Sequence, residues 1–229
     1  MARLTRLPQA VIFDMDGLML DTERLAARAW DEAAAAVGAT FDGALALRMI
    51  GRNFDDCTAM MRNECPPGYP VDAVLARWHP AYDAIVERDG LALKPGVVEL
   101  IDWLDARAIA RGVATSTRRA RAEAKLARTA LLPRFATVVG GDEVPRGKPA
   151  PDIYLEAARR LDVPPSRCLV LEDSEPGVRG ALAAGMVPIM VPDLLPPSPD
   201  LVARDIAIHA TLHHVAAMLA QVGSETRLR

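Results

Sequence analysis

The sequence is poor in aromatic residues and cysteine. Aromatic side chains make up 4% of the 229 residues, so we expect an aliphatic core built on Ala, Leu and Val. The three cysteines, Cys57, Cys65 and Cys168, show no C-x-x-C spacing and cannot all pair. This pattern disfavours a disulfide framework and a zinc site, and it fits reduced, buried thiols in a cytosolic protein.

The sequence also lacks an excess of charge and any long hydrophobic run. It has 27 Lys and Arg against 30 Asp and Glu, a formal net charge of −3, which excludes a strongly basic nucleic-acid binder. The longest charge-free apolar stretch, residues 180–192, contains two Gly and two Pro and is shorter than the ~20 residues of a membrane helix. No signal peptide is expected at the N-terminus. We therefore expect a soluble, cytoplasmic protein with no membrane or nucleic-acid partner, and a monomer by default.

What is present favours a globular α/β protein. With 51% hydrophobic and 25% charged residues, the chain can bury a sizeable core. Aliphatic runs bounded by turn residues predict strands at residues 10–13, 112–115, 136–139, 168–171 and 187–191. Stretches of helical periodicity separate the later runs, at residues 97–107, 118–131, 153–161 and 177–184. This alternation predicts a doubly wound parallel sheet, in which Pro188 places the last strand near an edge or makes it start late.

About 100 residues separate the first two expected strands, whereas a βαβ unit needs only ~30. Helical periodicity at residues 22–37, 53–64 and 71–88 predicts an inserted α-helical domain over residues 18–90, with the core formed by 1–17 and 91–229. The insertion has seven basic and twelve acidic residues, a net charge of −5 that leaves +2 for the core.

One helix of the core is locally basic. Its cationic residues are Arg118, Arg119, Arg121, Lys125 and Arg128. We interpret them as a solvated helix face, with a nucleic-acid-binding surface as the alternative.

Polar residues follow the expected strands, where open α/β sheets bind their ligands. Asp14 and Asp16 follow the first strand, and Glu172 and Asp173 follow the fourth. Like charges this close raise one another's pKa, and a divalent cation relieves the repulsion. All-oxygen ligands suit Mg²⁺. Taken singly, each Asp could instead be a helix cap or turn residue.

A phosphate seat is expected beside these acids. Thr115 and Ser116 end the second strand and open a helix, where backbone N–H groups and hydroxyls bind anions. Lys148 could neutralise the same phosphate, although each of the three is also an ordinary cap or surface residue. No G-x-G-x-x-G follows the first strand, residues 141–148 do not fit a P-loop, and no His follows an expected strand. Dinucleotide, P-loop and Ser-His-Asp sites are therefore disfavoured.

A metal, a phosphate seat and a carboxylate nucleophile together imply phosphoryl transfer through an aspartyl-phosphate. Residues 13–23, FDMDGLMLDTE, resemble the first motif of the haloacid dehalogenase superfamily. Three more motifs resemble it in order: ATS at 114–116, GKPAPD at 147–152 and LEDS at 171–174. The resemblance spans residues 10–191, and the helical insertion resembles that superfamily's small α-helical cap.

The resemblance implies roles for the acids. Asp14 would attack the phosphoryl group, and Asp16 would protonate the leaving oxygen and then activate water. Asp14, the backbone carbonyl of Asp16, and Asp173 would hold Mg²⁺, with Glu172 beside it. The resemblance is to members that have a second acid at the position of Asp16. The dehalogenases of this superfamily lack that acid and use no metal, so Asp16 argues against dehalogenase chemistry.

The resemblance also implies a phosphate site and a substrate face. Thr115, Ser116 and Lys148 would hold the phosphoryl oxygens. The cap face above the metal would supply specificity, and position alone suggests four residues there: Met19, Leu20, Arg52 and Asn53.

The resulting hypothesis is a Mg²⁺-dependent phosphatase acting on a small phosphorylated metabolite, such as a sugar phosphate. The alternative is a phosphomutase resembling β-phosphoglucomutase, whose pattern has a His four residues after the motif-one Thr and an Arg three residues after the cap Gly. Here Ala26 and Phe54 stand at those positions. The form LDTE at residues 20–23 is similar to that of phosphatases for sugar phosphates or pseudouridine 5′-phosphate. A non-catalytic phosphate sensor is a further alternative.

Overall fold

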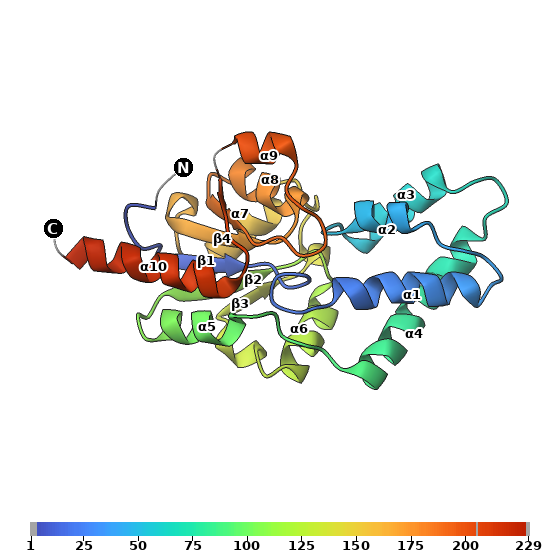
Figure 1. The fold of residues 1–229 in the computed structure, drawn as a ribbon, viewed down its shortest axis with the longest axis horizontal. Helices are drawn as coiled ribbons and strands as arrows, with labels where there is room; N and C mark the ends of the chain where they lie inside the picture. The colour runs from blue at the N-terminus through green and yellow to red at the C-terminus, as the bar shows by residue number, and fades with distance from the viewer. Residues whose placement is uncertain (1–3, 205, 228–229) are drawn as a thin grey trace.

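The computed structural model describes residues 4–204 and 206–227, and its centre is a six-stranded parallel sheet (Figure 1). The strand order is β3-β2-β1-β4-β5-β6, and every neighbouring pair is parallel. The strands are β1 (Ala10–Phe13), β2 (Ala110–Ala114), β3 (Thr137–Val139), β4 (Cys168–Glu172), β5 (Val187–Met190) and β6 (Ala207–Ile208). This arrangement confirms the predicted doubly wound α/β core, with the change of winding direction beside β1.

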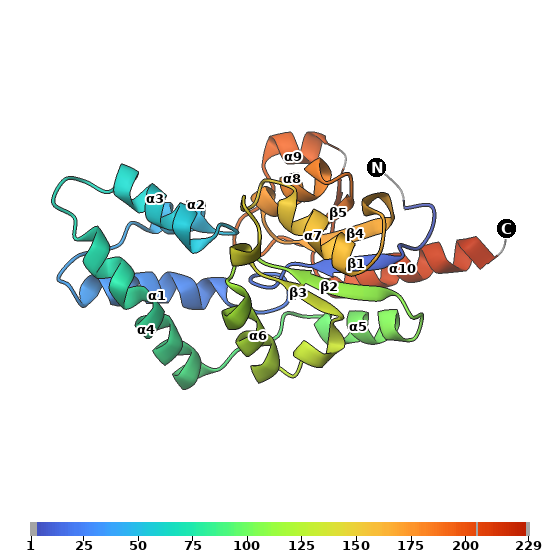
Figure 2. The ribbon, with the colours of Figure 1, turned by 180° about the vertical axis from the view of Figure 1, so that it is seen from behind.

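Helices cover both faces of the sheet because alternate residues of each strand point to opposite sides. Val11 and Phe13 pack in a cluster with α5 (Val97–Asp105), α6 (Arg119–Arg128) and α10 (Leu212–Arg227). Ala10 and Ile12 pack in a second cluster with α7 (Asp152–Arg160) and α8 (Glu175–Ala183), seen from behind in Figure 2. Both faces of β1 are thus buried, which explains its uninterrupted apolar sequence.

Four helices stand apart from the sheet at one end of the molecule (Figures 1 and 2). They are α1 (Glu23–Ala35), α2 (Gly43–Met49), α3 (Phe54–Glu64) and α4 (Val71–Asp89). They enclose a separate hydrophobic cluster that includes Trp30, Phe41, Met61 and Val74. These four helices lie in the part of the chain where the sequence predicts a helical insertion, α2 being an additional helix, and we call them the cap.

The first residues assigned to the cap belong to the sheet domain. Leu18, Met19 and Leu20 pack in the cluster that contains β1 and α5, and Leu20 forms an isolated β-bridge with Leu93. The helical part therefore begins at Glu23, a few residues later than the expected boundary at residue 18.

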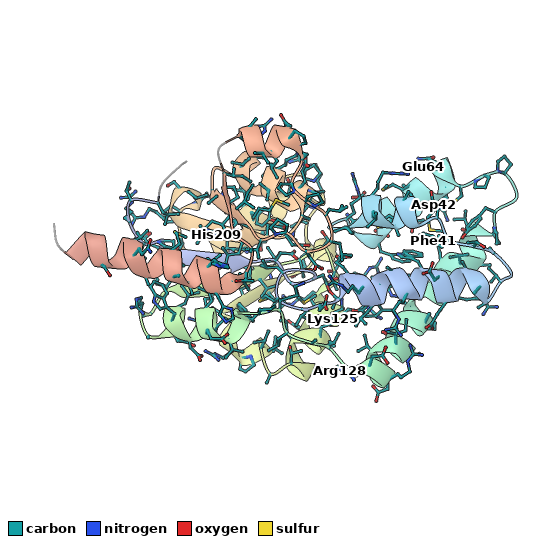
Figure 3. The ribbon with its side chains drawn as sticks, in the orientation of Figure 1. Phe41, Asp42, Glu64, Lys125, Arg128 and His209 are labelled. Carbon is teal, nitrogen blue, oxygen red and sulfur yellow. The ribbon has the colours of Figure 1, made fainter. Side chains whose placement is uncertain are left out.

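The C-terminal region adds α9 (Pro199–Ala203), β6 and α10, which the sequence analysis does not predict. Among the residues that the structure describes, three short 3-10 helices also occur, at Leu132–Arg134, Gly141–Glu143 and Pro165–Arg167. Pro188 pairs with Val170 of β4, and pairing with β6 begins only at Ile189, so the strand with Pro188 is next to the edge as predicted. His209 does follow a strand, β6, but it lies away from the cap (Figure 3).

The structure tests the expectations about cysteines and membrane helices but not those about location and oligomeric state. All three cysteines are free, with Cys57 and Cys168 buried. Within the described residues, no helix combines the length and apolar character needed to cross a membrane. The cytoplasmic location and the monomeric state stay predictions.

Candidate functional site

The predicted catalytic and phosphate-binding residues lie together at the carboxyl edge of the sheet. Phe13 pairs with Val113 of β2 and with Leu171 of β4, so these three strands end at the same level. Asp14 and Thr115 each follow the last residue of a strand there. The backbone N–H of Asp14 donates to the carbonyl of Leu171 at 3.0 Å, which continues the β1–β4 ladder to the residue predicted to be the nucleophile.

Lys148 lies between two of the carboxylates. Its Nζ is 2.5 Å from Asp14 Oδ1 and 2.5 Å from Glu172 Oε1. Glu172 also accepts hydrogen bonds from the Tyr154 hydroxyl at 2.8 Å and from the Ser174 backbone N–H at 3.0 Å. The side chains of Lys148 and Glu172 are almost fully buried, so neither can move away into solvent. The contact with Glu172 therefore holds Lys148 Nζ beside Asp14.

This part of the site holds more negative than positive charge. Burial raises the pKa of Asp14 well above its ordinary value, with Lys148 opposing the shift and Glu172 adding to it. Burial also raises the pKa of Asp173, and the charges of Glu172 and Asp14 raise it further. For Lys148, burial favours the neutral amine, but the carboxylates of Asp14 and Glu172 raise its pKa well above the ordinary value. One ammonium therefore serves three acids, and ionisation of all three carboxyls is unfavourable without a further cation.

This donor set fits a divalent cation. Across the described part of the chain, no group of three or more His, Cys, Asp or Glu side chains is arranged to hold a metal ion. Mg²⁺ does not need one, because it keeps several waters and binds through one or two carboxylates. Asp14 and Asp173 supply two buried carboxylates with raised pKa values. The loop after β1 comes so close to Asp173 that a Cβ on Gly17 would lie 2.3 Å from Asp173 Oδ2.

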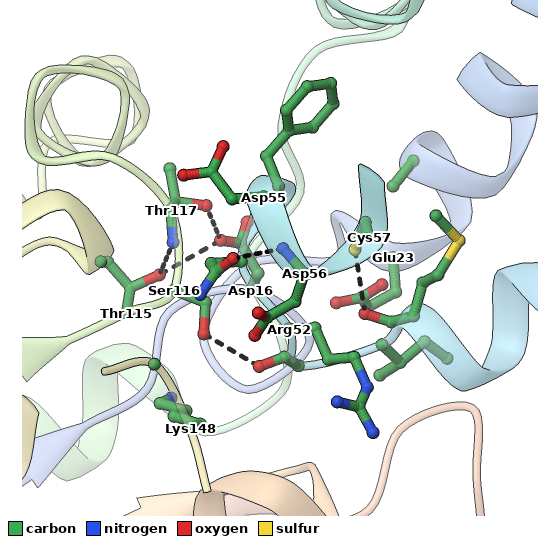
Figure 4. A pocket seen from close by; sticks show the side chains of 18 of the residues that line it. Asp16, Glu23, Arg52, Asp55, Asp56, Cys57, Thr115, Ser116, Thr117 and Lys148 are labelled. Carbon is green, nitrogen blue, oxygen red and sulfur yellow. Dashed lines mark hydrogen bonds between the residues drawn. The ribbon is translucent and has the colours of Figure 1, made fainter. Parts of the chain in front are cut away.

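Asp16 has a different set of partners from Asp14. Its Oδ1 accepts hydrogen bonds from Thr22 Oγ1 at 2.7 Å and from Lys125 Nζ at 2.6 Å. Its Oδ2 accepts from Thr117 Oγ1 at 2.7 Å (Figure 4). Burial would raise the pKa of Asp16, but the charge of Lys125 and these hydrogen bonds lower it below its ordinary value. The two acids of the first motif are therefore in opposite electrostatic environments.

Lys125 belongs to the basic helix α6, and the interpretation of that helix as a solvated face is wrong at this position. The Lys125 side chain is 13% exposed and pairs with Asp16. Arg121 and Arg128 of the same helix pair with Asp83 at 2.5 Å and Glu87 at 3.0 Å on cap helix α4. Figure 3 shows Lys125 where the sheet domain meets the cap. The basic face of α6 thus packs against the acidic cap.

A cavity of about 870 Å³ lies between the sheet edge and the cap. The sheet domain contributes Asp14, Asp16, Thr115 and Lys148 to its wall, and the cap contributes residues from all four helices. In Figure 4, the threonines after β2 lie on one side of Asp16, and the first turn of α3 lies on the other. Glu23 also lines the cavity, where burial followed by the charge of Asp16 raises its pKa to about 7.

The remaining predicted residues divide into two groups. Ser116 lines the cavity, and its hydroxyl donates to the carbonyl of Gly51 at 2.9 Å, which ties the sheet edge to the cap. Arg52 and Asn53 also line the cavity, and Asn53 caps α3. Met19 and Leu20 are fully buried in the sheet-side cluster and do not line the cavity. The expected substrate contacts of these two side chains are therefore corrected to core packing.

Comparison with known proteins identifies the family. A model described as "Hydrolase: haloacid dehalogenase-like hydrolase" matches residues 8–185. The chain belongs to this family. It is 36% identical over 209 residues to the protein CbbY of Rhodobacter capsulatus, covering 86% of this chain and 91% of that one. It is 33% identical over 178 residues to a phosphorylated carbohydrates phosphatase of Thermotoga maritima, covering 78% of this chain and 82% of that one.

A solved structure agrees with this assignment. The structure of a Thermotoga maritima protein assigned as a β-phosphoglucomutase matches the hydrolase with a TM-score of 0.75 and 30% sequence identity, covering 93% of this chain and 99% of that one. The resemblance inferred from the four motifs is thereby confirmed, and so is the doubly wound fold.

Several residues of the hydrolase site are missing from the sequence-based set. Thr22 lies inside the first motif and Thr117 directly follows the second, so the motifs contained a signal for both. Tyr154 is the one aromatic residue of α7 and lies on its buried face. Lys125 could be recognised only weakly from the sequence. The indication was its place between Ala122 and Leu126, which are buried positions of an amphipathic helix.

A glycine substitution tests how rigidly Glu172 is held. A Cβ on Gly177 in α8 would lie 1.9 Å from Glu172 Oε1, and the hydrogen bonds to Lys148 and Tyr154 prevent that carboxylate from moving away. We expect Gly177→Ala to lower the free energy of unfolding by about 1–3 kcal/mol in urea denaturation. Gly43→Ala, in open space at the start of α2, is the matched control and should not destabilise the protein. Equal stability of both variants would contradict the account.

A second substitution tests the link between Lys125 and Asp16. Replacing Lys125 by Met removes the cation and one hydrogen bond that lower the pKa of Asp16. The Asp16 carboxyl should then titrate at higher pH than in the unmodified protein, as measured by carbon-13 NMR without added metal. Arg128→Met removes another cation of α6 that pairs with Glu87, and it should leave the titration unchanged. The assignment fails if Lys125→Met also leaves it unchanged.

Proposed function

We propose that this hydrolase is a Mg²⁺-dependent phosphatase that acts on a small phosphorylated metabolite, such as a sugar phosphate, through an aspartyl-phosphate. The observation that carries the proposal is the position of Asp14, which follows β1, faces the cavity and pairs with buried Lys148. The relation to a phosphorylated carbohydrates phosphatase supports the substrate class.

The reaction follows from the two acids. A carboxylate oxygen of Asp14 attacks phosphorus, and the bond between phosphorus and the ester oxygen breaks. In its protonated form, Asp16 gives a proton to the departing ester oxygen, a transfer that Lys125 favours because it lowers the pKa of Asp16. The resulting carboxylate then takes a proton from the water that attacks the phosphoryl group on Asp14. Release of inorganic phosphate restores Asp14. The bonds that Asp16 makes to Thr22, Thr117 and Lys125 hold it at the cavity edge between these steps.

Other groups of the site oppose the charge of the phosphoryl oxygens. Lys148 is a buried cation directly beside Asp14, and Thr115 and Ser116 follow β2 on the same edge. Asp14, the backbone carbonyl of Asp16, and Asp173 would hold Mg²⁺, which when bound would neutralise the excess carboxylate charge and that of the phosphoryl group. The side chain of Asp16 is already occupied by Lys125 and two threonines, which supports a backbone role there.

A phosphomutase is the second candidate because of the likeness to the Thermotoga maritima protein assigned as a β-phosphoglucomutase. Two cavity-lining positions favour the phosphatase instead. Ala26 and Phe54 stand where the mutase pattern has His and Arg, and both line the cavity. Neither side chain can exchange a proton or bind a second phosphate, which supports release of the dephosphorylated product.

Replacement of the nucleophile tests the proposal most simply. Asp14→Asn removes the attacking carboxylate oxygen, so hydrolysis of p-nitrophenyl phosphate should fall by roughly three orders of magnitude or more. Chelation of Mg²⁺ should abolish the same activity reversibly. Asp72→Asn, on the exposed surface of α4, is a matched control that should retain activity. Normal turnover in Asp14→Asn would exclude Asp14 as the nucleophile.

The separate roles of Asp16 and Asp173 give another prediction. Asp16→Ala should lower turnover by about a hundredfold or more, since it removes the general acid and base, yet preserve most of the Mg²⁺ affinity measured by isothermal titration calorimetry. Asp173→Asn should lose that affinity, since it removes a ligand. Complete loss of Mg²⁺ binding in Asp16→Ala would show that the side chain, not the backbone, carries the metal role.

A further inference from the structure

The aromatic residues of this chain are concentrated at the cavity. The sequence contains only three Trp, three Tyr and four Phe, yet four of these ten, Trp30, Phe54, Trp78 and Tyr82, line the cavity. All four belong to the cap, and His79 adds a fifth ring to the same wall. These rings lie where the organic part of a substrate would lie, whereas Phe13, Phe135 and Tyr154 are buried in the sheet domain.

The rings form a continuous series that ends beside the catalytic acid. The ring centroids of Trp30 and Trp78 are 5.1 Å apart, and those of Trp78 and Tyr82 are 5.3 Å apart. The Tyr82 ring lies 4.9 Å from Lys125 Nζ, which in turn is 2.6 Å from Asp16. A leaving group that extends from the phosphate toward the cap thus meets aromatic surface within one side chain of Asp16.

Packing of the cap accounts for only part of this series. Trp30 and Tyr82 are 5% and 3% exposed, and they belong to the hydrophobic clusters of the cap. Phe54 and Trp78 pack against these clusters but are only partly buried, as is His79, and all three line the cavity. His79 stacks on Phe54 with a centroid distance of 4.7 Å and an interplanar angle of 28°. These three residues form what we call the aromatic wall.

Three of the cations that line the cavity have carboxylate partners. Arg121 pairs with Asp83, Arg146 with Asp152, and Lys125 with Asp16. Burial and the charge of Arg121 lower the pKa of His79, so its ring is a neutral stacking surface. A substrate that reaches the aromatic wall therefore contacts mainly ring surface. Such a surface binds a flat apolar group better than the hydroxyls of a polyol.

We propose that the ester cleaved by this enzyme carries a planar heteroaromatic ring that stacks on Phe54, Trp78 and His79, as in a nucleotide-sized phosphate monoester. The proposal rests on the proposed phosphatase function and narrows its substrate from sugar phosphates in general to phosphate monoesters that also carry a ring. The cavity of about 870 Å³ can hold such a molecule, since ligand pockets of this kind span ~300–1,000 Å³.

Two matched substrate pairs test the proposal with the intact protein and Mg²⁺. Uridine 5′-monophosphate differs from ribose 5-phosphate by its base, and flavin mononucleotide differs from ribitol 5-phosphate by its isoalloxazine ring. Because stacking of one ring on an aromatic side chain stabilises binding enough to change affinity by about tenfold or more, kcat/KM should be at least about tenfold higher for the ring-bearing member of at least one pair.

Variants then locate the effect. Trp78→Leu and His79→Leu should each reduce the ratio of kcat/KM values within the preferred pair several-fold. Trp103→Leu removes a tryptophan from α5, away from the cavity, and should leave the ratio unchanged. Since the ratio compares two substrates of one variant, partial loss of folded protein cancels.

The outcomes separate this inference from the proposed function. If p-nitrophenyl phosphate is hydrolysed but the ring-free member of each pair is used equally well or better, the phosphatase function stands and the aromatic substrate is wrong. If both wall variants keep the ratio of the unmodified protein, the wall does not bind the ring and the proposal is overturned. If no phosphate ester is hydrolysed, the proposed function fails and the inference fails with it.

Discussion

The arrangement of this enzyme depends on one buried ion pair, between Lys148 and Asp14. A charge removed from water is costly unless it is paired and hydrogen-bonded, so both groups require fixed partners. Glu172 supplies the second contact to Lys148 and is itself held by Tyr154 and Ser174. Helix α8 also packs against Glu172, so closely that there is no room for a side chain at Gly177. The Asp14 carboxylate is thus positioned by groups from three separate segments of the chain, and the cluster of buried acids favours binding of a cation.

A second network, around Asp16, joins the sheet domain to the cap. Lys125 of α6 binds Asp16 and lies over Tyr82 of α4, while Arg121 and Arg128 pair with acids of the same cap helix. The uneven charge of the two domains therefore has a structural use, since the acidic cap packs on the basic helix of the core. Exposed pairs of this kind stabilise little individually, roughly 0–1 kcal/mol, so their contribution is mainly orientation. They place the aromatic wall opposite the sheet edge.

Much of the fold and of the candidate site could be predicted from the sequence, for identifiable physical reasons. Strands buried on both faces give uninterrupted aliphatic runs, and the proposed nucleophile Asp14 and the proposed metal ligand Asp173 directly follow those runs. Position near a motif wrongly predicted substrate contacts for Met19 and Leu20, because the loop turns these side chains into the core. Lys125 could not be assigned, because its partner lies 109 residues away and only the folded chain brings them together. β6 has two residues, too few for any periodic pattern.

The central claim is that Asp14 itself carries the phosphoryl group during turnover. Its most direct test is mass spectrometry of the protein quenched in acid during steady-state hydrolysis of p-nitrophenyl phosphate with Mg²⁺, followed by digestion to place the modification. The account predicts one added phosphoryl group on Asp14, absent from protein that has not met substrate and from Asp14→Asn. Rapid turnover with a phosphoryl group on another residue, or with none on Asp14 under conditions that preserve acyl phosphates, would contradict it.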